Sequence, residues 1–191
     1  MKKFTNEQII QIVIAVLMAY LFGGVIGWIY ETFICAPLNG EEINLLHGGL
    51  GIPFLTIYAI GAAVMEIILG CGRKQFNPVL QVLACAAICT VLEYISGLFL
   101  LHVVGVQTWD YRLPGWDFLV TPDGLICLRA SLTFGIMGLI QLRAVRAFRE
   151  KCVEKNMKVT LIVCIILFLI VVLAVLNSSV FHIVDVGTQW Q

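Results

Sequence analysis

The feature that most constrains this chain is a series of apolar runs long enough to cross a lipid bilayer. The clearest of them extends from Val79 to Leu101 and contains a single carboxylate, Glu93. A membrane-spanning α-helix needs about 20 mainly apolar residues. Only 13% of the residues are charged, against ~25% in typical soluble proteins. We therefore predict an all-α integral membrane protein.

Five spanning segments are predicted in a single membrane domain, residues 1–191. They cover residues 9–33, 54–69, 79–101, 125–142 and 159–176. The first apolar run is longer than the core of a secretory signal and no small-residue cleavage site follows it, so we predict a retained helix. The approach to the second segment is rich in glycine and proline, which fits either a re-entrant segment or a loop.

The distribution of basic residues predicts the orientation. Ten basic residues fall in the N-terminal segment and in the second and fourth connections: Lys2, Lys3, Arg73, Lys74, Arg143, Arg146, Arg149, Lys151, Lys155 and Lys158. The first connection has none, and the third has Arg112 alone. Because cytoplasmic loops carry an excess of Lys and Arg, we predict a cytoplasmic N-terminus and an extracytoplasmic C-terminus.

With this orientation, three charged residues from three helices fall in the outer half of the bundle: Glu31, Glu93 and Arg129. An ionisable group at bilayer depth costs at least ~2.5 kcal/mol unless it is paired or faces water. We therefore expect Arg129 to lie between the two carboxylates. Such a cluster fits two roles, a structural clamp between helices or a polar cavity that contacts a solute or relays protons.

Small residues and a loop surround this predicted cluster. Gly23 and Gly27 have the GxxxG spacing of closely packed membrane helices, and Ser131, Gly135 and Gly138 form a second small-residue face. The third connection contributes Trp109, Asp110 and Tyr111. Its aromatic residues suit the membrane interface, and Asp110 either caps the cluster or stays solvated.

Charged residues are also predicted near the cytoplasmic end. Glu66 lies near the inner end of the second segment, where its side chain could extend toward the headgroups. Arg143, Arg146 and Arg149, at three-residue spacing, predict a cationic extension of the fourth helix. This face would either anchor the chain on anionic headgroups or dock a cytoplasmic partner.

The sequence predicts no enzyme, metal site or cofactor. The seven cysteines form no CxxC pair, and His47 and His102 lack metal-ligand spacing. HExxH and GxSxG are absent, as is the phosphate-binding G-x-x-x-x-G-K-[ST] loop. The formal net charge is +0, and nothing predicts a nucleic-acid partner.

Several short segments in order resemble the bacterial putative ABC-transporter permease family of CmpB type, also called type IV. They are Gly27–Phe33 (GWIYETF), Gly51–Ala62 (GIPFLTIYAIGA), Thr90–Gly97 (TVLEYISG), Trp109–Tyr111 (WDY) and Gly124–Leu128 (GLICL). The resemblance covers about residues 23–142. Where family members usually carry proline, glycine and arginine, this chain has Thr56, Ala59 and Leu125. Arg129 is then the only basic residue at the depth of the cluster.

The resemblance implies a membrane-embedded transport subunit in the bacterial inner membrane, a multi-pass chain that works with a separate ATPase subunit. Five spans are few for a complete pathway, so a homo- or hetero-oligomer is expected. The alternative is a scaffold, sensor or assembly factor without transport activity, whose intramembrane charges are structural. An intramembrane enzyme is the least favoured reading, because Glu93 lacks a nucleophile, a metal or a second base.

Overall fold

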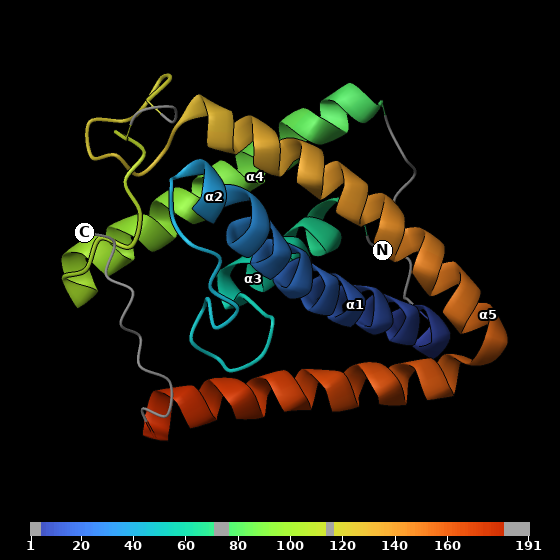
Figure 1. The fold of residues 1–191 in the computed structure, drawn as a ribbon. Coiled ribbons are helices and arrows are strands. Elements are labelled where there is room, and N and C mark those ends of the chain that lie inside the picture. Colours follow the sequence, from blue (N-terminus) through green and yellow to red (C-terminus); the bar gives the residue numbers. More distant parts are fainter. Residues whose placement is uncertain (1–4, 71–76, 114–116, 182–191) are drawn as a thin grey trace. The chain divides into compact units, whose positions relative to one another are not determined.

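The computed structural model describes residues 5–70, 77–113 and 117–181, which form helices and loops apart from one isolated bridge between Val120 and Cys127. The helices, shown in order in Figure 1, are α1 (Asn6–Tyr30), α2 (Ala36–Leu38), α3 (Thr56–Met65), α4 (Pro78–Phe99) and α5 (Leu128–Phe181). Three π-helical turns extend them: η1 (Glu31–Cys35), η2 (Glu66–Gly70) and η3 (Leu100–Val104). The predicted basic residues Lys2, Lys3, Arg73 and Lys74 lie outside the described residues.

Within the described ranges, three helical stretches are long and apolar enough to cross a membrane: Asn6–Leu38, Pro78–Val104 and Leu128–Ser178. Thr56–Gly70 is a shorter apolar helix. These stretches overlap all five predicted segments, and the fourth and fifth both lie mainly on α5, although residues 54–55 and 125–127 precede the helices. The helical and apolar character is therefore confirmed. The number of crossings and the orientation of the termini stay predictions.

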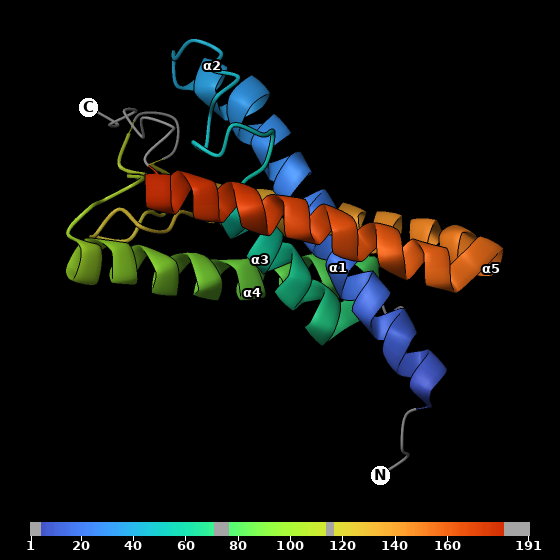
Figure 2. The same ribbon diagram turned by 90° about the horizontal axis from the view of Figure 1, so that it is seen from below.

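The chain divides into two compact units, residues 1–73 with 141–186, and residues 74–140 with 187–191. In the first unit, α1 and α3 lie side by side (Figure 2). A Cβ on Gly23 would overlap the Cβ of Ala62, and one on Gly27 would overlap the ring of Tyr58. The GxxxG prediction of close packing is confirmed, with α3 as the partner.

A sharp bend at Asn156 divides α5 into two helical arms, both in the first unit over residues 141–155 and 157–181 (Figure 1). Asn156 has non-helical dihedral angles (φ −165°, ψ 99°). Its Oδ1 accepts the N–H of Val159 at 3.1 Å, which is how asparagine caps the start of a helix. The next arm therefore begins directly after the bend.

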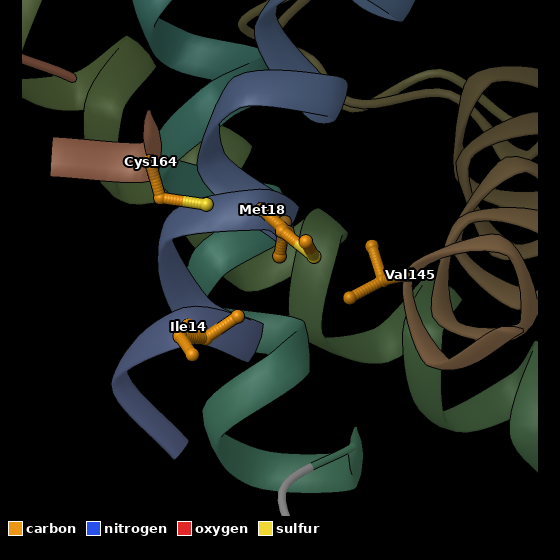
Figure 3. Packing of buried hydrophobic residues seen from close by; sticks show 5 residues of the cluster. Ile14, Met18, Val145 and Cys164 are labelled. Carbon is orange, nitrogen blue, oxygen red and sulfur yellow. The ribbon is translucent and has the colours of Figure 1, made fainter. Parts of the chain in front are cut away.

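The two arms of α5 pack against α1. Figure 3 shows Ile14 and Met18 of α1 between Val145 on one arm and Cys164 on the other. All four side chains are buried. Because the arms share one core on α1, this helix organises the first unit.

The second unit pairs α4 with the first turns of α5. Gly135 lies so close to α4 that a Cβ there would be 2.7 Å from the carbonyl oxygen of Val82 and 3.0 Å from the Cβ of Ala86. The Thr90 hydroxyl donates to Ser131 Oγ at 2.7 Å. The predicted small-residue face of the fourth segment therefore packs against α4. The loop between the two helices forms the candidate site.

Candidate functional site

Glu93, the carboxylate in the apolar helix α4, is bound by the loop that follows the helix. The Tyr111 hydroxyl donates to Glu93 Oε1 at 2.6 Å. The Oε2 atom of Glu93 is also shielded from solvent. A hydrogen bond to a carboxylate stabilises by about 1.5–3 kcal/mol. The loop thus offsets part of the cost of placing this charge in an apolar helix.

The same loop is fixed one turn further along α4. The indole Nε1 of Trp109 donates to the carbonyl of Leu125 at 3.0 Å, and Leu125 is only 1% exposed. A Cβ on Gly97 would lie 2.9 Å from Leu125 Cδ2 and 3.1 Å from Trp109 Cζ2. The absence of a side chain at Gly97 therefore lets both residues close over the helix.

Asp110 forms an ion pair within the loop. Its Oδ1 accepts from Arg112 Nε at 2.8 Å, and the side chains are 34% and 53% exposed. The Arg112 hydrogen bond is the main cause that lowers the pKa of Asp110. Asp110 is therefore engaged with Arg112 at the solvated side of the loop, and Tyr111 is the loop residue that reaches the carboxylate of α4.

We predict that this ion pair stabilises the loop fully above about pH 4 and progressively less at lower pH. The folded-state pKa of Asp110 is lowered, so its contribution is present above the unfolded-state pKa and is lost as pH falls through the folded-state value. The Tyr111 amide donates to the carbonyl of Gly124 at 2.8 Å. At pH 6 the hydrogen-exchange protection of this amide, corrected for intrinsic rate, should be greater in the unaltered protein than in the Asp110→Asn variant. A pH-independent difference between the two proteins would contradict this assignment.

Arg129 lies in the first turn of α5, and its side chain is exposed. The charges of both Arg129 and Glu93 act on the buried thiol of Cys127. These two predicted members of the cluster therefore lie near one common residue in the second unit. Their direct pairing stays a prediction.

Glu31 belongs to the first unit, where η1 presents it to α3. The Tyr58 hydroxyl donates to Glu31 Oε1. Partial burial raises the pKa of nearby Glu41, with a smaller contribution from Glu31, while His47 opposes the shift. Each predicted carboxylate thus has a tyrosine donor within its own unit. The grouping of Glu31 with Glu93 and Arg129 stays a prediction.

The three arginines of the predicted cytoplasmic face lie on α5, which continues through them without a break. Arg143 is exposed, whereas Arg146 and Arg149 are half-buried. Glu66 is 3% exposed, and the positive charges of Arg149 and Arg146 act on its carboxyl group. Sequence reasoning did not connect Glu66 with these arginines. The signal that could have connected them was their shared position near the inner helix ends.

Sequence reasoning also missed Tyr58, the donor to Glu31. Its signal was present, because a shielded carboxylate needs a donor and Tyr58 is one of the few polar residues in the second segment. Within the described ranges, no three His, Cys, Asp or Glu side chains gather closely enough to hold a metal ion.

The family model described as "Putative ABC-transporter type IV" matches residues 18–179 of the chain. The chain belongs to this family. No curated protein and no solved structure gives a significant match. The family name, together with the apolar helices, identifies a membrane protein of the ABC-transporter class.

The family match is wider than the residues 23–142 on which the resemblance rests. It includes the second arm of α5 up to residue 179. All of the candidate residues discussed above lie inside it, from Glu31 to Arg149.

Proposed function

We propose that this chain is the membrane-embedded subunit of a bacterial ABC-type transporter, located in the inner membrane and driven by a separate ATPase subunit. Membership of the type IV family supports the transport role. The sequence contains no phosphate-binding loop of the G-x-x-x-x-G-K-[ST] type. In this proposal a second chain carries such a loop and hydrolyses the ATP.

The observation that carries the solute-contacting role is the Glu93 carboxylate within the apolar helix α4. Ionisable residues at this depth commonly mark solute, ion or proton pathways. Tyr111 binds Glu93. The charges of Glu93 and Arg129 both act on the thiol of Cys127, so the two residues lie near this one thiol. In this proposal Glu93, Arg129 and Glu31 form the outer polar cluster, and the loop at Trp109–Tyr111 covers it.

The proposed topology has five crossings, with the N-terminus in the cytoplasm. The bend at Asn156 supports this topology, because it separates the predicted fourth segment from the predicted fifth and places them on different arms of α5. Exposed Lys151, Lys155 and Lys158 surround this bend. Such a basic connection is expected on the cytoplasmic side. The arginine-bearing arm that leads to it is the proposed ATPase dock.

The second candidate function is a scaffold, sensor or assembly factor. It is favoured by the contacts of the loop with α4, since Tyr111 binds Glu93 and Trp109 lies close to Gly97. In that case the charges hold the fold together, and the loop presents a surface to an extracytoplasmic partner.

Purification of the tagged chain from its own membranes in mild detergent, followed by mass spectrometry, separates these functions. We expect an ATPase subunit with a phosphate-binding loop to co-elute. Arg143→Gln should reduce its yield, because Arg143 is exposed on the proposed dock. Arg112→Gln is the matched control, an exposed arginine of the opposite predicted side. Recovery of the chain without any ATPase would remove the main support for transport.

A further inference from the structure

The three arginines on the first arm of α5 do not form one uniform cationic face. A helix has 3.6 residues per turn, so each three-residue step turns back by about 60° around the axis. Arg143 is exposed, whereas Arg146 and Arg149 are half-buried. The arm therefore presents Arg143 outward, while the other two approach the remainder of the first unit.

Glu66 is the buried acidic group on which the charges of Arg146 and Arg149 act. Its side chain is 3% exposed, and its Oε2 atom has no hydrogen-bond partner among the described residues. A Cβ on Gly70 would overlap the Glu66 carboxyl group, so this carboxyl lies against the end of the π-helical turn η2. Arg149 and Arg146 are the cations whose charges act on it.

Apolar contacts hold the same arm against α1. Val145 is fully buried against Ile14 and Met18 (Figure 3). The rings of Phe148 and Phe22 meet edge-to-face with centroids 5.5 Å apart. These contacts hold the arm against α1. A buried carboxylate is tolerated only where nearby charges or hydrogen bonds offset its desolvation.

We propose that Glu66 is a positioning residue that draws Arg146 and Arg149 toward α1 and η2, and so fixes the arm that presents Arg143 and Lys151 to an acidic surface of the ATPase subunit. The partner in this statement rests on the proposed function. The positioning of the arm does not, because all the contacts lie within the first unit.

The test measures a distance inside the first unit with two nitroxide labels. One label replaces Val13, a 42% exposed residue of α1, and the other replaces exposed Ala147 on the arm, in a background without other cysteines and in lipid nanodiscs. We expect one narrow distance distribution for the unaltered pair and a broader or shifted one for Glu66→Gln. Glu150→Gln removes an exposed acid of the same arm and should leave the distribution narrow.

Combining the substitutions shows whether Glu66 acts through the arginines. Arg146→Gln with Arg149→Gln should broaden the distribution as Glu66→Gln does. In that background Glu66→Gln should add no further change, since coupled residues are not additive. An unchanged distribution in Glu66→Gln, or additive effects of the three substitutions, would overturn the proposal.

Co-elution of the ATPase separates this inference from the proposed function. We expect Glu66→Gln to lower the ATPase yield while the amount of folded chain stays unchanged. If no ATPase co-elutes even with the unaltered chain, the proposed function fails, while a broadened distribution still supports the positioning role. If the distribution broadens and the ATPase yield is unchanged, the link between Glu66 and docking is overturned.

Discussion

Gly23→Leu is expected to force α1 and α3 apart and to prevent the first unit from folding. A single Cβ at this position already overlaps the Cβ of Ala62 and comes within 3.0 Å of the Tyr58 carbonyl oxygen. A backbone carbonyl cannot turn away as a flexible side chain can, so the whole helix must move. Overpacking commonly costs about 1–3 kcal/mol. We expect about that loss for Gly23→Ala and a larger one for Gly23→Leu.

The matched control for this substitution is Gly61→Leu. Gly61 lies on α3, the partner helix, but a Cβ there meets nothing within 4 Å. Replacing a helical glycine by a residue with a side chain usually gains up to about 1 kcal/mol in helix propensity. The variants are compared by their unfolding midpoints, measured by circular dichroism at increasing concentrations of a denaturing detergent. Equal midpoints for Gly23→Leu and Gly61→Leu would show that the close approach of α1 and α3 is not needed for stability.

The packing at Gly23 could be predicted from sequence because it depends on a local pattern. Glycines four residues apart share one helix face, whatever the partner is. The partner helix could not be predicted from a local pattern, because the pairing depends on residues 39–55, which bring α3 back along α1. The same limit explains Tyr58, whose role as donor to Glu31 follows only from the pairing of these helices.

Charged residues were predicted less well than apolar ones. The periodicity of apolar residues places a segment in a membrane, but it does not say which charge faces which. Glu66 was expected to extend toward the headgroups, whereas the structure buries it beside the arm that carries Arg146 and Arg149. Asp110 was left between two roles, and the structure shows its Oδ1 bound to Arg112 Nε. In both cases the interaction is between side chains, and the period of the sequence does not reveal it.

We expect Tyr111→Phe to destabilise the second unit more than Glu93→Leu does. Removing the Tyr111 hydroxyl leaves the Glu93 carboxylate in place without the donor that binds it at 2.6 Å. The loss of a hydrogen bond to a charged group costs about 1.5–3 kcal/mol. Glu93→Leu instead removes the charge together with its desolvation cost. Replacing a buried charged group by an apolar residue of similar volume is often neutral or stabilising.

The double variant tests this asymmetry and bears on function. In the Glu93→Leu background, Tyr111→Phe should cost much less, because the hydroxyl no longer has a carboxylate to bind. Denaturant unfolding of the four proteins, with exchange of the loop amides as a local probe, gives the coupling. A fully additive result would mean that the Tyr111–Glu93 bond contributes nothing to the loop. The Glu93→Leu variant can fold well and yet fail to restore function in cells that lack the native chain. That result would show that the carboxylate serves the outer polar cluster and is not needed for folding. A Glu93→Leu chain that is folded and fully competent would instead favour the scaffold function.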